Sequence, residues 1–427
     1  MYRYFYVDKE VANNKDKKAD KRVGEAAPAE APPDRGERAG LLEPLLVSDT
    51  SRHRAALSDL ALELTAESTR LRTALPESIA SALATLVRAM NCYYSNLIEG
   101  HDTHPVDIER ALADDFSAEP KQRNLQLEAK AHIEVQKWID EGGLVGRATT
   151  ESGVREIHER FCAHLPPELL IVEDNETGEE LDMIPGAYRV RDVIVGRHVA
   201  VSPGAVPRFM QRFEEGYAKL GKTDRILCAA SAHHRLLWIH PFFDGNGRVA
   251  RLMSHALLLE ALDTGGLWSV ARGLARAESE YKKLLQACDL PRRNDLDGRG
   301  NLSEETLAEF TRFVLETCID QVTFMRGLME PERLRDRVMI WAEEETRGGR
   351  LPGKAKELLS AILYRGEVQR GDVAEIVGAS ARTARRVVSE LTDIGVVQSA
   401  SPRAPVQLRF PAELAGRWMP GLFPDKK

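Results

Sequence analysis

The 427-residue sequence lacks the marks of several specialised classes of protein. No uninterrupted apolar run approaches the ~18 residues of a membrane-spanning helix, so no membrane association is expected. The N-terminus, MYRYFYVDKE, has no apolar segment of the kind that a signal peptide contains. The cysteines are odd in number, far apart and never in a C-x-x-C pair, which predicts reduced thiols in a cytoplasmic protein. They are Cys92, Cys162, Cys228, Cys288 and Cys318.

A large excess of one charge is also missing. The formal net charge is −7 and the sequence pI is about 6.0, which excludes a chain that binds nucleic acid over its whole surface. A single small basic domain that binds nucleic acid stays compatible with this net charge. The 43% hydrophobic and 29% charged content is that of a globular protein, and the length predicts two to four domains.

What stands out is one stretch, residues 240–251, with the sequence HPFFDGNGRVAR. An apolar helical pattern over residues 223–239 runs up to it, and Pro241 predicts that this helix ends at His240. Gly245 and Gly247 permit backbone conformations that other residues resist, so the amides there can form an anion-binding nest. The stretch therefore predicts a loop that binds phosphate.

A second helix, predicted over residues 248–262, would direct its free amides and positive dipole end at the same place. Arg248 and Arg251 lie three residues apart and can both reach a polyphosphate. Asp244 is a carboxylate suited to Mg²⁺, and His240 is a base with an ordinary pKa near neutrality. Together these residues suit attack by a hydroxyl group on a nucleotide phosphate.

This stretch resembles the HPFx[DE]GNGRxxR signature of the Fic family, with every fixed position filled, and the similarity covers roughly residues 90–325. The resemblance implies transfer of AMP from ATP to a Ser, Thr or Tyr hydroxyl of a target protein, and of the chain itself, with release of pyrophosphate. It implies that His240 is the general base. The related Doc kinases carry lysine near the second glycine of this loop, so Gly247 favours AMP transfer.

The resemblance also assigns the neighbouring residues. Asp244 would hold Mg²⁺ on the α- and β-phosphates of ATP, and Phe242 would be the apolar anchor of the nucleotide-binding loop. Tyr281 would lie beside the adenine. The remaining nucleotide-binding residues are Gly245, Asn246 and Gly247, which would cradle the phosphates, and Arg248 and Arg251, which would grip the β- and γ-phosphates.

A second motif lies upstream of this loop, at the end of a long predicted helix. Ser95, Glu99 and Gly100 match the [ST]xxxE[GN] inhibitory motif of Fic proteins, and Ser95 and Glu99 share one helix face. The resemblance implies that Glu99 pairs with Arg251, displaces the γ-phosphate and leaves ATP in an unproductive pose. Since the motif precedes the catalytic loop, the chain is similar to the class inhibited by its own N-terminal helix.

A Val- and Ile-rich run at residues 184–202 predicts a β-hairpin that turns at Gly196. Its position is similar to that of the hairpin flap of Fic proteins, which suggests that Val193, Ile194 and Val195 hold a target segment by strand addition. A purely structural hairpin is the alternative.

The predicted fold class is mainly α: a Fic-type helical bundle with a small hairpin flap and a C-terminal winged helix-turn-helix domain. We expect a flexible N-terminal tail at residues 1–40, a helical region with the inhibitory helix at 41–120, a catalytic core at 121–330 and the winged helix at 331–427. Arg382, Arg385 and Arg386 cluster on the third helix of that last domain and could meet DNA, although such domains also bind proteins.

Two other functions remain open on the sequence alone. One is a DNA-binding regulator that senses a nucleotide without turnover, and the other is removal of AMP from modified proteins. The intact His240 favours the enzyme, because a sensor has no need of a base. A homodimer is also expected, since relatives often dimerise.

Overall fold

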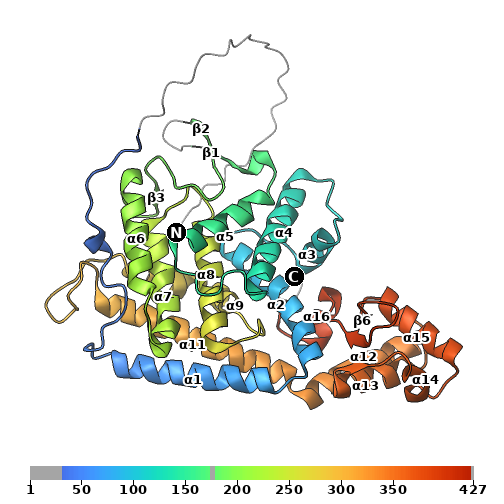
Figure 1. Ribbon diagram of the computed structural model, residues 1–427. Coiled ribbons are helices and arrows are strands. Elements are labelled where there is room, and N and C mark those ends of the chain that lie inside the picture. The colour runs from blue at the N-terminus through green and yellow to red at the C-terminus, as the bar shows by residue number, and fades with distance from the viewer. Residues whose placement is uncertain (1–30, 174–177, 425–427) are drawn as a thin grey trace, which may run out of the picture.

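The computed structural model describes residues 31–173 and 178–424, and over these residues the chain is mainly helical, as predicted (Figure 1). Residues 1–30 of the predicted N-terminal tail lie outside the described part. The helices are α1 (Arg54–Thr73), α2 (Glu77–Ile98), α3 (Pro105–Leu112), α4 (Pro120–Asp140), α5 (Glu151–Ala163), α6 (Val206–Tyr217), α7 (Lys222–Ile239), α8 (Asn246–Leu262), α9 (Val270–Arg276), α10 (Glu278–Ala287), α11 (Glu304–Met329), α12 (Pro331–Arg347), α13 (Ala355–Arg365), α14 (Val373–Ile376), α15 (Ala381–Asp393) and α16 (Ala412–Trp418).

Helices α7 and α8 pack side by side at the centre of the bundle (Figure 1). Leu236 and Ile239 of α7 and Leu252 and Met253 of α8 are fully buried, which fits the apolar sequence of both helices. On one side α5 and α6 complete an apolar core around Phe209. On the other, α1 packs along α11, and α2 packs against α4 and α9. The loop between α7 and α8 is thus held by helices on both sides.

The core does not divide at residue 120, where sequence analysis separates two regions. One cluster of buried apolar side chains joins Leu83 of α2 to Phe310 of α11 and continues to Leu391 of α15. The same cluster includes Leu227 of α7 and Leu258 of α8, so the helix that carries the predicted inhibitory motif shares a core with the helices on both sides of the loop. The predicted boundary marks no gap in packing.

The predicted flexible tail is wrong for residues 33–37, which bind the folded core. The Asp34 carboxylate accepts hydrogen bonds from Arg208, and Glu37 accepts two from Ser202. A 3₁₀ helix, Ala39–Leu42, follows and buries Leu42. The composition of this segment does not indicate these contacts, because charged side chains and backbone groups make them and large apolar residues do not.

In residues 31–173 and 178–424 the strands are short and fall into three sheets. The predicted hairpin is present as β3 (Ile194–Val195) and β4 (His198–Val199), paired antiparallel. A second hairpin, β1 (Ile171–Glu173) with β2 (Glu180–Asp182), was not expected from the sequence. Among the described residues, no helix combines the length and apolar character needed to cross a membrane.

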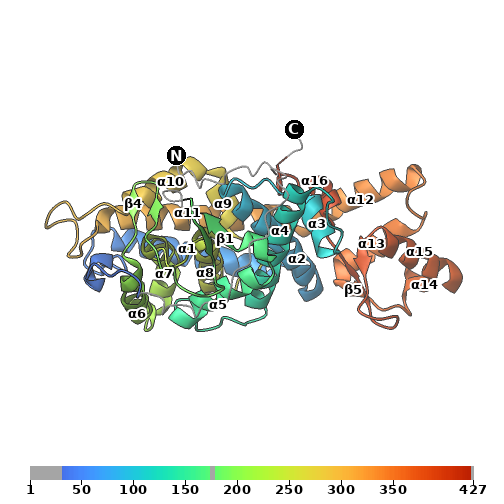
Figure 2. The same cartoon turned by 90° about the horizontal axis from the view of Figure 1, so that it is seen from above.

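The C-terminal region extends from one side of the bundle (Figure 2). It contains α12 to α16 and a three-stranded sheet in the order β5-β7-β6, formed by β5 (Glu367–Val368), β6 (Val397–Gln398) and β7 (Val406–Leu408). The predicted third helix of this region, which carries Arg382, Arg385 and Arg386, corresponds to α15. That the region is a winged helix-turn-helix domain stays a prediction.

Candidate active site

The loop between α7 and α8 begins at His240, which has a left-handed backbone conformation with φ of 51°. This conformation is unusual for a residue with a side chain, and it ends α7 with a hydrogen bond from the His240 amide to the Leu236 carbonyl. Pro241 follows and prevents the helix from continuing. The chain therefore turns sharply at the predicted base.

The side chain of His240 is 4% exposed, and its Nδ1 lies 3.3 Å from the carbonyl oxygen of Leu237. A carbonyl only accepts hydrogen bonds, so Nδ1 carries the proton and Nε2 keeps its lone pair. Burial, with help from the nearby Arg189 guanidinium, lowers the pKa of His240 from 6.5 to about 3. The ring is thus a neutral imidazole whose Nε2 can accept a proton.

Phe242 and Asn246 fix the shape of the loop. The Asn246 side chain accepts a hydrogen bond from the Phe242 amide at 3.0 Å and donates one to the Phe242 carbonyl at 2.9 Å. The Phe242 ring is fully buried and stacks on His158, with the centroids 3.9 Å apart. The full burial of the ring fits the predicted anchor, and the assignment of Phe242 to the nucleotide-binding residues stays a prediction.

The two glycines of the loop serve different ends. Gly245 has φ of 77°, a conformation that glycine tolerates best, and precedes the first turn of α8. At Gly247 a side-chain carbon would clash with the Glu99 carboxylate, which lies directly against the first turn of α8. The free amides and dipole of a helix N-terminus attract anions, so Glu99 occupies a place suited to a phosphate.

The predicted inhibitory residues come together at this point. Arg251 donates from Nε to the Ser95 hydroxyl at 2.8 Å, and its Nη2 forms an ion pair with Glu99. Gly100, with φ of 87°, ends α2 in a motif in which His101 N–H bonds to the Asn96 carbonyl. Burial would raise the pKa of Glu99, but Arg251 and Arg248 outweigh it and hold this pKa below its usual range.

Arg248 is placed differently from its partner in the motif. Its Nη2 lies 2.6 Å from Glu128 Oε2, and the same carboxylate lies 2.9 Å from His101 Nδ1. Only 6% of the Arg248 side chain is exposed, and its guanidinium lies over the Phe161 ring at 5.1 Å. In this structure Arg248 therefore joins α8 to α4 through Glu128, and its contact with phosphate stays a prediction. No motif in the sequence indicates Glu128, which lies 120 residues before Arg248.

A pocket of about 620 Å³, which includes its opening to solvent, lies in front of the loop. His240, Gly247, Glu99 and Arg251 line the pocket, with Tyr281 on another side. Tyr281 is 2% exposed and its hydroxyl hydrogen-bonds His233 Nε2 at 2.8 Å, so it offers little ring surface for stacking.

Asp244 stands just before the first turn of α8 and is partly exposed. Burial raises the pKa of its carboxyl group, while Arg248 lowers it to a smaller extent. One carboxylate beside an anion-binding helix end fits Mg²⁺, which takes one or two carboxylates and completes its shell with phosphate oxygens and water. The described residues contain no cluster of three His, Cys, Asp or Glu side chains that could hold a metal by themselves.

The predicted flap borders this pocket. Val195 lines it, and Ile194 is 62% exposed at the edge of the hairpin. The Val193 carbonyl accepts a hydrogen bond from Ala200, which closes the hairpin. The flap thus presents an apolar edge beside the catalytic loop, as a segment that binds an extended chain would.

Comparisons with known proteins agree with this site. Residues 148–258 match the Fic/DOC family. Protein adenylyltransferase Fic of Nematostella vectensis is 31% identical over 175 residues, which are 40% of this chain and 37% of that protein. Protein adenylyltransferase Fic of Drosophila grimshawi is 29% identical over 171 residues, or 40% and 32% of the two chains.

The chain therefore spans about a third of the length of these curated relatives. Among solved structures, a Fic family protein from Desulfovibrio desulfuricans G20 aligns with 85% of this chain and 98% of its own, at 16% identity and a TM-score of 0.49. The signature loop at residues 240–251 lies within the matched segment. The similarity to the Fic/DOC family thus holds for residues 148–258, which include this loop.

Proposed function

We propose that this chain transfers AMP from ATP to a Ser, Thr or Tyr hydroxyl of a target protein, and to itself, with release of pyrophosphate. The observation that carries the proposal is the placement of His240. Its neutral ring keeps a lone pair on Nε2, in a pocket that also contains Arg251 and the N-terminus of α8. A base and an anion-binding site in one pocket suit phosphoryl-type transfer, which depends on positioning and charge stabilisation.

In the proposed reaction the hydroxyl oxygen attacks the α-phosphorus while its proton passes to His240 Nε2. The bond from the α-phosphorus to the bridging oxygen breaks, and pyrophosphate leaves with the electron pair. A pKa of about 3 makes His240 a weak base in the free protein. Negative phosphates beside the ring favour its protonated form, so nucleotide binding is expected to raise this pKa toward the working pH.

Arg251 and the first amides of α8 would bind the phosphates beyond the α-phosphorus and stabilise the leaving group. Asp244 would hold Mg²⁺, which when bound neutralises phosphate charge. Release of Arg248 from Glu128 would be needed before it could join them.

We also propose that Glu99 inhibits the transfer. Its carboxylate lies against Gly247 and pairs with Arg251, so it takes both the helix N-terminus and the guanidinium that a γ-phosphate needs. ATP would then bind without its terminal phosphate in place, which turns the α-phosphorus away from His240. Removal of this carboxylate should raise the activity.

The test is incorporation of label from α-³²P-ATP with Mg²⁺, both into the chain and into lysate proteins. Three proteins are compared: the wild type, Glu99→Gly, and Glu99→Gly combined with His240→Ala. We expect label to rise in the single variant and to disappear in the double variant. Binding of nucleotide without label in any variant would contradict AMP transfer. Release of AMP from prelabelled protein, stimulated by Glu99, would support AMP removal instead.

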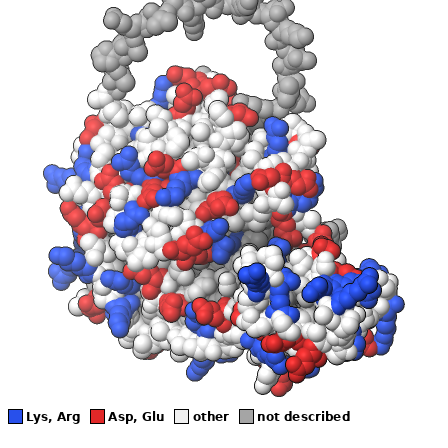
Figure 3. Space-filling view, turned by 45° about the vertical axis from the view of Figure 1, so that its right-hand side comes forward, with Lys and Arg blue, Asp and Glu red and all other residues white. Residues whose placement is uncertain are grey.

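For the C-terminal region we propose DNA contact through α15. Three arginines are exposed on this helix: Arg382, Arg385 and Arg386. Lys and Arg side chains gather on the lobe that the C-terminal region forms (Figure 3). Contacts with phosphates make affinity fall with salt. Binding of duplex DNA, measured by fluorescence anisotropy, should weaken in Arg382→Ala and Arg385→Ala, and not in Arg347→Ala of α12. A dimer and a cytoplasmic location stay predictions.

A further inference from the structure

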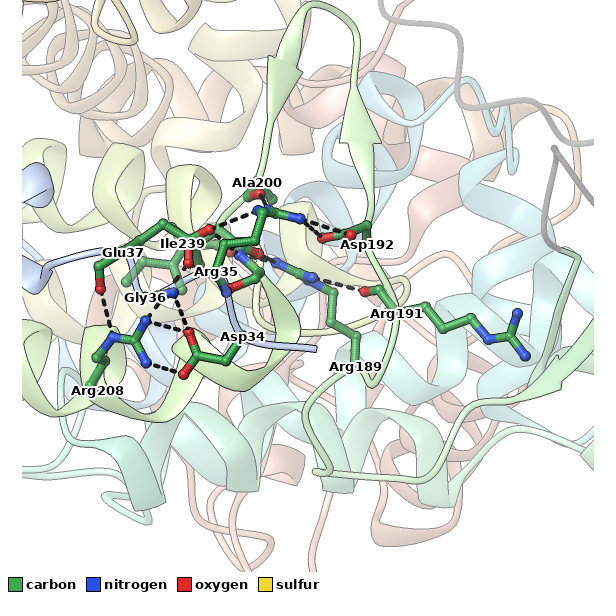
Figure 4. Close-up of polar contacts among 12 residues, drawn as sticks. Asp34, Arg35, Gly36, Glu37, Arg189, Arg191, Asp192, Ala200, Arg208 and Ile239 are labelled. Carbon is green, nitrogen blue, oxygen red and sulfur yellow. Dashed lines mark hydrogen bonds and ion pairs between the residues drawn. The ribbon is translucent and has the colours of Figure 1, made fainter. Parts of the chain in front are cut away.

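The neck of the flap, where its two strands leave the core, is held by two arginines (Figure 4). Arg189 lies inside the protein and Arg35 lies on the surface, and each one contacts both sides of the neck. We call this pair of residues the neck clamp. Neither residue belongs to the catalytic or the inhibitory motif.

Arg189 is 1% exposed. Within the described residues, the hydrogen bonds that its guanidinium donates go to backbone carbonyls. Nη1 bonds to Arg191 at 2.8 Å on one side of the neck, and Nη2 bonds to Val201 on the other. Burial lowers the pKa of Arg189 to about 10, so the group stays charged at neutral pH. A buried cation that bridges two strands fixes their separation.

The same side chain reaches the catalytic loop. Nε of Arg189 donates to the carbonyl of His240 at 2.8 Å, and the Arg189 amide donates to the carbonyl of Pro241 at 2.9 Å. His240 needs such support because its left-handed backbone is unfavourable for a residue with a side chain. One residue therefore joins the start of the flap to the backbone that orients the base.

The outer half of the clamp comes from the N-terminal segment. Arg35 binds both carboxylate oxygens of Asp192, at 2.9 and 2.8 Å, and its Nη2 lies 3.3 Å from the Ala200 carbonyl. The Arg35 amide donates to the Ser202 hydroxyl at 3.0 Å. Figure 4 shows Arg35 reaching across from the segment to Asp192 and Ala200, with Arg189 behind it.

The segment that carries Arg35 is itself fixed to α6. Arg208 binds the Asp34 carboxylate at 2.5 and 2.7 Å and donates to the Glu37 carbonyl at 2.6 Å. At Gly204 a side-chain carbon would lie 2.7 Å from Asp34 Cβ, so the segment passes closely over this glycine. These contacts make Asp34 to Glu37 a fixed support for Arg35.

We propose that Arg189 and Arg35 are positioning residues, which keep the flap and the backbone of His240 in one fixed relation. A target hydroxyl held along the flap then meets Nε2 of the base. The proposal rests on the proposed AMP transfer for its kinetic consequence, but its structural consequence can be measured without any turnover.

The inner half is tested with Arg189→Lys in the Glu99→Gly chain. Lysine keeps the charge but cannot reach both strands and the loop together. Self-labelling from α-³²P-ATP should fall roughly 10- to 100-fold, because small displacements of a base cost that much. In ¹⁵N-histidine spectra of the full chain, the His240 signal should change from the Nδ1-protonated tautomer to a mixture. An unchanged tautomer in a folded variant would overturn this half.

The outer half is tested with Arg35→Ala and, from the other side of the contact, Gly204→Ala. An exposed ion pair contributes little to stability, so both variants should fold. Amide hydrogen exchange in residues 193–200 should rise up to about fivefold in both variants. When Arg35→Ala or Gly204→Ala is added to the Glu99→Gly chain, a higher concentration of a lysate target should be needed for half of the maximal labelling rate. The ATP concentration needed for half of the maximal rate should not change.

Arg347→Ala is the matched control, because it removes an exposed ion pair with Glu343 in α12, outside the flap and the bundle helices that hold it. The exchanged pair Arg35→Asp with Asp192→Arg should restore the protection lost in Arg35→Ala. Equal exchange in wild type, Arg35→Ala and Gly204→Ala would overturn the outer half. If Glu99→Gly incorporates no label, the proposed function fails, while the tautomer and exchange measurements still decide the clamp.

Discussion

Removal of the Glu99 carboxylate should destabilise the protein while it activates the enzyme. Arg251 is 3% exposed, and within the described residues its guanidinium binds Glu99 and two oxygens of Ser95. Without Glu99, the buried guanidinium keeps only the neutral oxygens of Ser95 as acceptors. Loss of one partner of a buried ion pair costs about 3–5 kcal/mol. Because Glu99 is still 14% exposed, we expect about 3 kcal/mol for Glu99→Ala, at the lower end of this range.

Binding of ATP should restore part of the free energy of unfolding that Glu99→Ala loses. A phosphate bound at the N-terminus of α8 supplies the negative charge that Arg251 lost, whereas in the wild type it has to displace Glu99. MgATP should therefore raise the unfolding midpoint of Glu99→Ala more than that of the wild type. The assay is urea unfolding with and without MgATP, in a His240→Ala background that prevents turnover.

Glu99→Gln is the matched comparison, since it keeps an acceptor for Arg251 and should lose less stability than Glu99→Ala. Equal stability of all three chains, with equal shifts on adding MgATP, would refute a carboxylate that competes with phosphate. The pH dependence gives a second test. The folded pKa of Glu99 lies below 4.5, so its contribution is present above that value and is lost as the pH falls through the folded pKa. Inhibition should therefore persist from neutral pH down to about pH 5.

Three further outcomes follow from buried groups. His158, His233 and His240 have pKa values lowered by burial to about 4, 3 and 3, so the unfolded chain binds more protons than the folded chain below pH 6.5. Urea midpoints should fall as the pH decreases from 6.5 toward 4, and a flat profile would contradict this. Phe242→Ala should cost about 3–5 kcal/mol in urea unfolding, and a loss below 1 kcal/mol would contradict its role as an anchor. Asn246→Ala should cost roughly 1–3 kcal/mol and abolish self-labelling, and retained labelling would exclude it as a brace of the loop.

The helices on both sides of the loop could be predicted from the sequence, because their apolar periodicity and end signals are local. Serine is a typical N-cap residue, and the hydroxyl of Ser303 accepts a hydrogen bond from the Thr306 amide at the start of α11. The short strands of the second hairpin were missed, since β1 and β2 have three residues each and carry no clear alternation. Local patterns thus predict elements that are long enough to repeat.

The site was predicted in part, and the limit follows from sequence separation. The Ser95, Glu99 and Arg251 contact agrees with what the resemblance implies, because both of its motifs are themselves short and local. The pairing of Glu128 with Arg248 has no such motif, and neither does the attachment of Asp34 to Arg208. Nothing in the spacing of these residues distinguishes them from solvated surface charges.

The orientation of the base is a further property that the signature does not encode. His240 is placed by the carbonyl of Leu237, which selects its tautomer, and by Arg189, which supports its backbone. A backbone carbonyl is present at every residue, so the first contact leaves no mark in the sequence. The second depends on a side chain about 50 residues upstream. A chain could therefore keep HPFFDGNGRVAR intact, lose Arg189 and hold its base in the wrong orientation. The signature specifies the groups that are proposed to take part, while contacts outside it decide how the His240 ring is oriented.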